Sequence, residues 1–259
     1  MTAPGGGARA RRPLTAVTAL ALAAGITATA LAACSSSVRS LHQPTNNYSV
    51  RGHVQTVVVT NDVGDVQVSG VSTGTVSVVE HMTFRDLAPV TRHQVSGGTL
   101  HLTGICPAAE ICSVSYDITV PRATSVRVTD RVGSIRVDSL SGQLTAHTQA
   151  GKIDLDAVSG AVEASTDAGT ISGQALTAPR ATLQVSAGAI DAAFAAPPAA
   201  ITATTSVGAV TLRVPGNVSY RVDASATVGA VEVSVTRSAG ASREITASTR
   251  TGAIIIEPT

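Results

Sequence analysis

One pentapeptide of this 259-residue chain has the pattern G-x-S-x-G, which presents the nucleophilic serine in many hydrolases. It runs from Gly70 to Gly74 and would make Ser72 the nucleophile. In those enzymes the pentapeptide turns the chain from a strand into a helix. Here alternating apolar residues flank it on both sides, as they do in two consecutive strands. We therefore expect a plain turn between strands and predict no catalytic residue.

Histidines and aspartates are the other candidates for catalysis or metal binding. His81, His93 and His101 could meet on one loop, but none of the six histidines has the H-E-x-x-H spacing of a zinc enzyme. Asp138 and Asp156 occupy equivalent positions of a repeat, where stacked carboxylates can bind calcium. The next equivalent positions hold Gln and Ala, however, and the acids are too scattered for a glycoside hydrolase. We predict no metal site, no cofactor and no enzymatic activity.

Two cysteines, Cys106 and Cys112, lie close together in the run GICPAAEICSV. A disulfide between them is the preferred interpretation for an exported protein, and so short a loop would gain about 2 kcal/mol of stability. Free thiols are the first alternative. A metal pair is the second, although no nearby cysteines complete a four-ligand zinc pattern.

The N-terminus has the features of an export signal. Three arginines precede an uncharged apolar stretch from Leu14 to Ala33, as in secretory signal peptides. The tetrapeptide ending at Cys34, Leu-Ala-Ala-Cys, resembles the lipobox of bacterial lipoproteins, in which the cysteine carries a diacylglycerol. We predict a lipoprotein signal peptide at residues 1–33 with lipid attachment at Cys34, followed by a flexible tether at 34–50. An uncleaved membrane anchor and an ordinary signal peptide are the alternatives.

A short signature recurs eight times in the rest of the chain: a glycine, a variable residue and a β-branched aliphatic residue. Its spacing of about 20 residues from Gly133 onward is typical of a solenoid. Each repeat contains two runs in which apolar and polar residues alternate, as expected of two half-buried strands. The aliphatic positions of the signature are Val66, Ile135, Ile153, Ile171, Ile190, Val210, Val231 and Ile254.

These repeats predict an all-β fold, a single-stranded β-helix or β-solenoid whose coils of about 20 residues hold two short strands each. The solenoid should span residues 51–259, with an irregular excursion near 80–113. Aromatic residues make up only 2% of the chain, which suits a thin aliphatic interior. Stacking of successive coils would place Arg136 over Asp154. We also expect the isoleucines at 254–256 to form an exposed edge at the end of the solenoid.

The run from Tyr116 to Thr166 resembles a bacterial putative-adhesin family of unknown function. The similarity lies in a Val-Pro pair followed by stacked G-x-I-x-V coils, and it covers most of residues 54–256. It implies a β-solenoid on a bacterial surface or envelope. It carries over no catalytic residues.

Charged residues make up only 14% of the chain and its formal net charge is +1, so a nucleic-acid partner is not expected. We predict a non-enzymatic, exported β-solenoid that is lipid-anchored to the outer face of the cell membrane and acts as an adhesin or envelope-interaction protein. Its partners would be the membrane, through the N-terminal lipid, and a cell-envelope glycan or surface protein. The alternative is a glycan- or solute-binding envelope lipoprotein, with residues 80–113 as the specificity element.

Overall fold

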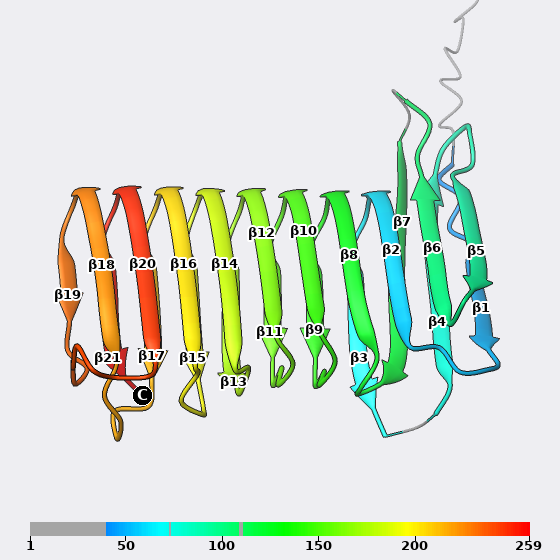
Figure 1. Ribbon diagram of the computed structural model, residues 1–259. Helices are drawn as coiled ribbons and strands as arrows, with labels where there is room; N and C mark the ends of the chain where they lie inside the picture. The colour runs from blue at the N-terminus through cyan, green and yellow to red at the C-terminus, as the bar shows by residue number, and fades with distance from the viewer. Residues whose placement is uncertain (1–39, 73, 109–110) are drawn as a thin grey trace, which may run out of the picture. The chain divides into compact units, whose positions relative to one another are not determined.

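The computed structural model describes residues 40–72, 74–108 and 111–259. These residues form two β-sheets that face each other and are joined by tight corners (Figure 1). The prediction of an all-β fold is confirmed, since the described residues contain strands and turns but no helix. None of them forms a helix that is long and apolar enough to span a bilayer. Cys34 and the predicted signal peptide lie outside the described residues.

Each sheet is a single row of hydrogen-bonded strands whose order from one end to the other differs from the order of the chain. Sheet A contains β1 (Thr45–Val50), β4 (Val76–Phe84), β7 (Cys112–Pro121), β3 (Val66–Val71), β9 (Ile135–Asp138), β11 (Ile153–Asp156), β13 (Ile171–Leu176), β15 (Ile190–Phe194), β17 (Val210–Val214), β21 (Ile254–Pro258) and β19 (Val231–Val233). Sheet B contains β18 (Arg221–Val228), β20 (Glu244–Thr251), β16 (Ala200–Val207), β14 (Arg180–Ala187), β12 (Val162–Ala168), β10 (Leu144–Ala150), β8 (Ser125–Val132), β2 (Thr56–Val63), β6 (Thr99–Ile105) and β5 (Val90–Ser96).

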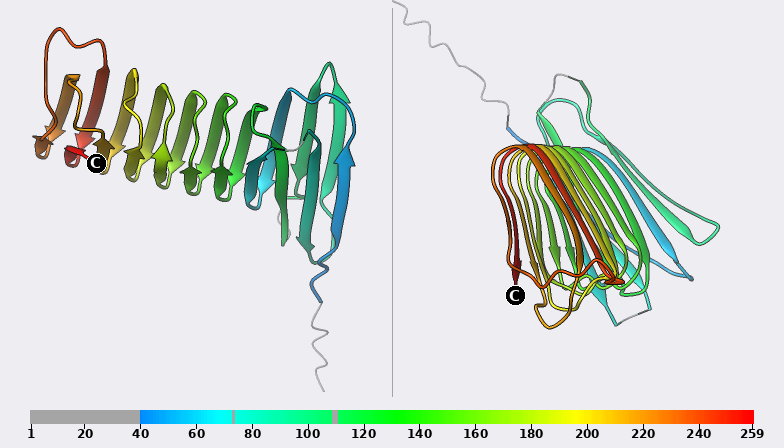
Figure 2. Two further views of the ribbon diagram at one scale, coloured as in Figure 1. Left: turned by 90° about the horizontal axis from the view of Figure 1, so that it is seen from below. Right: turned by 60° about the vertical axis from the view of Figure 1, so that its left-hand side comes forward.

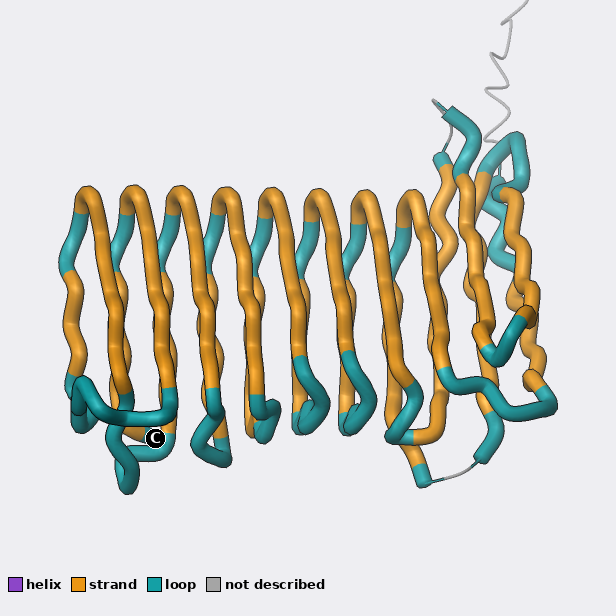
Figure 3. Tube along the Cα trace, viewed as in Figure 1, coloured by secondary structure: helices purple, strands orange, loops and turns teal. Residues whose placement is uncertain are grey.

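Each coil contributes one strand to each sheet, and neighbouring coils pair in parallel (Figures 2 and 3). Ile135 pairs with Ile153, and Ile153 with Ile171, so the aliphatic residues of the signature form one column. In β11 the side chains of Ile153 and Leu155 are buried, whereas Asp154 and Asp156 face outward. This alternation is what a strand with one face on the core requires. The column therefore forms part of the aliphatic core.

The glycine of the signature lies at the corner that leads into eight strands of sheet A, namely β3, β9, β11, β13, β15, β17, β19 and β21. At Gly151 the backbone adopts φ +156°, and a Cβ there would lie 1.9 Å from the carbonyl oxygen of Gly133 in the neighbouring coil. No side chain fits at that distance. Stacking of the corners at hydrogen-bonding distance is therefore the physical reason why the signature requires glycine.

The interior accommodates rings at three places, although we expected little room for them. Tyr116, Phe194 and Tyr220 are almost completely buried. Phe194 follows an irregularity in register between β13 and β15, next to Gly173. A Cβ on that glycine would lie 2.7 Å from the side chain of Leu176, so the missing side chain makes room for larger neighbours.

The N-terminal end is closed by antiparallel strands. Residues 45–50, which we assigned to the flexible tether, instead form β1, which pairs with β4, and β4 in turn pairs with β7. The reason is that the unpaired edge of β4 offers backbone partners, and Val50 turns into the core. Residues 80–113 complete β4, form the antiparallel pair β5–β6 and lead into β7. The predicted excursion therefore caps the stack, and β6 and β7 add a coil outside β2 and β3.

The C-terminal end does not follow the order of the chain. The last coil, β20 and β21, lies between the coil of β16 and β17 and the coil of β18 and β19. Our expectation of an exposed edge at residues 254–256 is therefore wrong, because β21 pairs with β17 on one side and β19 on the other. The outermost coil consists of residues 221–233, which lie inside the chain and are connected to the stack at both ends.

Candidate functional site

The outer face of sheet A carries a polar trough across several coils. Two adjoining hollows of about 280 and 320 Å³ form it, and they share Ser172 and Gln174. We call this surface the sheet A trough. Its polar and small side chains come from β9, β11, β13, β15 and β17 and from the residue before β11: Arg136, Asp138, Lys152, Asp154, Asp156, Ser172, Gln174, Asp191, Ala193 and Arg213.

Most charges of the sheet A trough are paired with one another. Asp154 accepts from Arg136 at 3.4 Å, as the sequence predicted, and from Lys152 at 2.6 Å. Farther along, Arg213 pairs with Asp191 at 2.6 Å. Exposed ion pairs of this kind contribute at most about 1 kcal/mol each, so they order the surface more than they stabilise the fold.

Two carboxylates of the sheet A trough lack a cation. Asp138 and Asp156 stack as neighbours in β9 and β11, as predicted from the repeat. Within the described chain no arginine or lysine forms an ion pair with either of them. The described residues also contain no group of three or more histidine, cysteine or acidic side chains arranged to hold a metal ion. The hollow that contains Asp138 and Asp156 is lined by two cations and three carboxylates, which leaves one formal negative charge in excess.

A second polar feature is buried at the corners of sheet B. Thr148 and Thr166 occupy equivalent positions in β10 and β12, are almost completely buried, and donate to the carbonyl oxygens of Gly133 and Gly151 at 3.3 Å. Thr205 and Thr249 repeat this contact in β16 and β20. Each threonine satisfies a corner carbonyl of the neighbouring coil. We call this set of positions the corner column.

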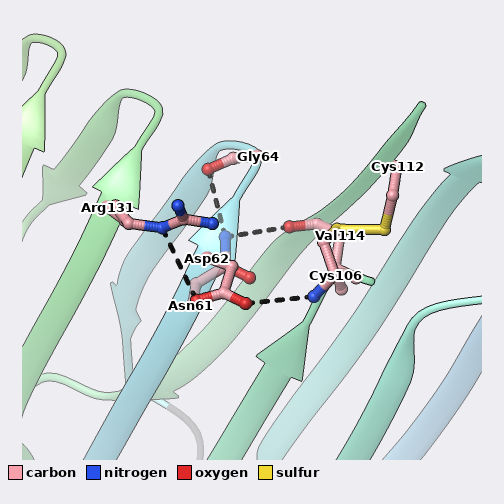
Figure 4. Close-up of polar contacts among 7 residues, drawn as sticks. All are labelled: Asn61, Asp62, Gly64, Cys106, Cys112, Val114 and Arg131. Atoms are coloured by element: carbon pink, nitrogen blue, oxygen red, sulfur yellow. Dashed lines mark hydrogen bonds and ion pairs between the residues drawn. A yellow bond between two sulfur atoms is a disulfide. The ribbon is translucent and has the colours of Figure 1, made fainter. Parts of the chain in front are cut away.

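Asp130 occupies the corner column in β8, between Asn61 of β2 and Thr148 of β10. Its side chain is 1% exposed, and neither carboxylate oxygen has a hydrogen-bond partner among the described residues. Asn61 donates to Val114 and Gly64 carbonyls at 3.0 and 3.2 Å, which leaves its own oxygen unpaired (Figure 4). A protonated Asp130 could donate a hydrogen bond as a threonine does, whereas an ionised one cannot.

The surroundings of Asp130 favour the protonated acid. Burial raises the pKa of Asp130 from 3.8 to about 7. The amide of Asn61 and the backbone N–H of Arg131 oppose this shift without reaching full hydrogen-bond geometry, and the charges of Asp65 and Asp62 add to it. The junction between the capped end and the regular coils thus contains an acid that titrates near neutrality.

The predicted disulfide lies beside this junction (Figure 4). Cys106 and Cys112 are bonded, which confirms the disulfide expected from the sequence. Asp62 accepts from the backbone N–H of Cys106 at 3.1 Å and lies 3.8 Å from Nε of Arg131. The bridge and Asp62 together fasten the β6–β7 connection to β2 and β8.

Sequence and structure comparisons agree with this architecture. The sequence model of the Toastrack DUF4097 family matches residues 47–256. The chain belongs to this family. The solved structure of a putative adhesin from Bacteroides fragilis superposes with a TM-score of 0.52 at 16% identity, covering 85% of this chain and 99% of that one. At this identity the likeness establishes the fold alone.

Two further solved structures are more distant. A putative cell adhesion protein from Clostridium sporogenes is 14% identical, covers 84% of this chain and 100% of its own, and has a TM-score of 0.43. A putative adhesin from Parabacteroides merdae is 11% identical over 84% and 96% of the two chains, with a TM-score of 0.45. Comparison with curated proteins gives no match. Membership in the toastrack family thus establishes the fold but not the activity.

The toastrack fold separates the histidines that we considered together. His81 of β4 lies 3.1 Å from Asp117, His93 of β5 stacks on Tyr48 with ring centroids 4.2 Å apart, and His101 lies on β6. They do not form one site. The G-x-S-x-G pentapeptide lies between β3 and β4, so it joins two strands as expected.

A second buried acid, Glu80, lies in the cap of the toastrack stack and is not among the residues predicted from the sequence. Glu80 is 2% exposed and accepts from the hydroxyl of Tyr48 at 2.7 Å. Burial and this contact raise the pKa of Tyr48 above its usual range. The signal was present in the alternation, because Glu80 continues the inward-facing series of Val76 and Val78. An acid at such a position requires a donor nearby.

Proposed function

We propose that this toastrack protein is a non-enzymatic envelope-interaction module of the adhesin type, exported and lipid-anchored through Cys34 to the outer face of the cell membrane. The observation that carries the proposal is the sheet A trough. It extends over five strands of the stack as an open polar surface, which suits contact with a large polar partner better than capture of a small substrate.

The ion pairs of the sheet A trough support a role in binding a partner and not in catalysis. Arg136, Lys152 and Arg213 all lie against aspartates of the sheet A trough. Catalytic acids and bases usually have shifted pKa values and converge on one reacting atom. Among the described carboxylic acids, Asp130 has a clearly raised pKa, but it is buried in the corner column and has no access to the trough. In the trough itself the hydrogen bond to Asp191 raises the pKa of Arg213, which keeps this side chain a cation and unsuited to proton transfer.

The anchoring part of the proposal is tested by labelling. Cells that express the full chain should incorporate labelled palmitate into it, and Cys34→Ala should abolish the label and release the protein from the membrane fraction. Protease added to the medium should digest the anchored chain on intact cells, provided that no further membrane lies outside the one that carries the lipid anchor. Absence of label together with a Cys34→Ala protein that still sediments with membranes would contradict lipid anchoring.

The proposed binding of the trough to the cell envelope is tested with isolated envelope fragments. The Cys34→Ala protein should sediment with envelope fragments, and the double variant Asp154→Ala/Arg213→Ala should lose most of this binding. Arg221→Ala is the matched control, because Arg221 forms an exposed ion pair with Glu244 at 2.7 Å on sheet B, outside the trough. Equal binding by all three proteins would show that the trough makes no contact.

A second candidate function is glycan binding at the same trough. It is favoured by the uncompensated carboxylates of Asp138 and Asp156 beside Ser172 and Gln174, which offer donors and acceptors for sugar hydroxyls. The trough lining contains no aromatic ring on which a sugar could stack. The two hollows of the trough are lined by residues outside 80–113, so this candidate function places recognition on the trough and not on that segment. Binding on a glycan array that Gln174→Ala removes would support this function.

A further inference from the structure

Apolar side chains are exposed together at the N-terminal end of the stack. The connections β4–β5 and β6–β7 and the entry of the chain into β1 rise beyond the corners of the coils there (Figure 1). Each contributes an exposed aliphatic residue. We call this set the apolar crest, and it consists of Leu41, Leu87, Val90, Ile105 and Ile111.

Backbone contacts hold the segments of the apolar crest together. Val90 and Ile105 are direct partners in the antiparallel pair β5–β6, where their side chains point to the same face. The N–H of Arg85 donates to the carbonyl of Ile111 at 3.1 Å. His42, next to Leu41, pairs with Phe84 through two backbone hydrogen bonds of 2.8 and 3.0 Å. Backbone hydrogen bonds therefore fix the segments that carry the crest relative to one another.

The chain that leads to the proposed lipid is short. His42 is fixed at Phe84, so only eight residue steps separate it from Cys34. Eight extended residues span at most about 30 Å. The predicted tether of residues 34–50 would have allowed about twice that reach, but β1 and the His42 pairing remove its second half. His42, next to Leu41 of the crest, is thus held within about 30 Å of any lipid on Cys34.

The chemistry of the crest fits the interface of a bilayer. Contiguous exposed aliphatic residues are unusual on soluble surfaces and mark sites of contact with proteins or membranes. Arg85 and Arg92 are exposed beside the crest, on the β4–β5 connection and on β5. Aliphatic side chains flanked by arginines suit the boundary between acyl chains and anionic headgroups.

We propose that the apolar crest inserts into the lipid interface and holds the N-terminal end of the stack against the membrane, with the coils of β16 to β21 pointing away. The inference rests on the proposed lipid anchoring at Cys34. It adds a second, non-covalent membrane contact that fixes the orientation of the sheet A trough relative to the bilayer. A single attached chain would otherwise leave the stack free to rotate.

The absence of tryptophan from the chain allows a direct test. Leu87→Trp places a reporter on the crest, at a side chain that is 56% exposed, and Val228→Trp places a matched one on the outermost coil, at a side chain that is 61% exposed. Each full-length lipoprotein is purified from membranes and reconstituted into vesicles of phosphatidylethanolamine and phosphatidylglycerol with brominated acyl chains. We expect the emission of Leu87→Trp to shift to shorter wavelength and to be quenched about twofold or more, and that of Val228→Trp to be unaffected.

A third protein makes the result specific to the crest. Adding Val90→Glu to Leu87→Trp places a charge in the crest and should restore unquenched, water-like emission. If Leu87→Trp floats with the vesicles but emits like Val228→Trp, the crest proposal is overturned while anchoring stands. If the proteins do not float with the vesicles, lipid anchoring fails, and the crest proposal fails with it.

Discussion

Asp130→Thr should stabilise the protein at neutral and alkaline pH. The substitution gives β8 the residue that β10, β12, β16 and β20 carry at the same register of the corner column. A threonine hydroxyl can donate to the corner carbonyl at any pH, whereas Asp130 can do so only when protonated. The variant therefore replaces a titrating group by a permanent donor.

The size of the effect follows from linkage. Asp130 has a pKa of about 7 in the folded protein, against 3.8 as the ordinary value of an aspartate. Below about pH 4 Asp130 is protonated in both the folded and the unfolded protein, so its ionisation does not lower the free energy of unfolding. As the pH rises toward 7 the unfolded chain releases this proton first, so folding stability falls by on the order of 4 kcal/mol and stays low at higher pH. Asp130→Thr removes this loss and should gain about 2–4 kcal/mol at pH 8 and little at pH 4, because repacking offsets part of the gain.

Urea unfolding followed by far-ultraviolet circular dichroism measures this difference at several pH values. Thr148→Val is the control, because it removes the hydroxyl at the equivalent position of the next coil, where no charge exists. It should cost about 1 kcal/mol at every pH. Val185 already occupies the corner column in β14, so the apolar residue fits there. If Asp130→Thr changes the unfolding free energy equally at pH 4 and pH 8, the acid is not buried in its neutral form.

Two further predictions concern the stacking itself. Gly151→Ala should destabilise the protein by about 3–5 kcal/mol in urea unfolding, because its Cβ would lie 1.9 Å from a carbonyl oxygen, whereas Gly74→Ala should be nearly neutral because nothing lies within 4 Å of its Cβ. Equal effects of the two substitutions would refute the steric role of the corner. Deleting residues 244–259 should release residues 221–233 as well, since β18 and β19 pair only with β20 and β21 among the described strands. Limited proteolysis should then cut after β17, and resistance of residues 221–233 would contradict the observed order of the coils.

The sequence predicted the parts of the fold that repeat. The register of Ile135, Ile153 and Ile171 could be derived from the spacing of the Val or Ile column alone. The expected equal burial of this column is wrong at one position, because Val231 lies in the outermost coil and is 42% exposed. The same register correctly placed Arg136 over Asp154. The disulfide followed from the short separation of its cysteines. These predictions share one property, which is that the interacting residues lie one coil or less apart in the sequence.

The parts that could not be predicted depend on which coil neighbours which. The signature of Val231 is as regular as that of Ile254, so periodicity cannot reveal that residue 254 lies next to Val210. The role of β1 was hidden for a similar reason, because its partner β4 runs antiparallel and breaks the repeat. Asp130 looked like an ordinary polar residue of a strand. Its burial becomes visible only when the threonines of the other coils are aligned with it.

At both ends the last parallel coil of the stack consists of residues from inside the chain. At one end β6 and β7 lie outside β2 and β3, and at the other β18 and β19 lie outside β20 and β21. The β6–β7 coil is covered by β5 and β4, whereas the β18–β19 coil has neighbours on one side only and would fray first. Because that coil is connected to the stack at both of its ends, its detachment leaves a loop whose two ends stay fixed. The chain gains less conformational entropy from this than from the release of a free terminus.

The two ends nevertheless differ in how they are finished. The N-terminal end is capped by β1, β4 and β5, and Glu80 and Tyr48 satisfy each other there. In the outermost C-terminal coil, by contrast, the inward-facing Val222 and Ala224 remain only half buried. The stack therefore has one closed end, which carries the apolar crest and the proposed lipid, and one open edge. With the closed end on the membrane, the sheet A trough and the open edge are the surfaces that a partner outside the cell would meet.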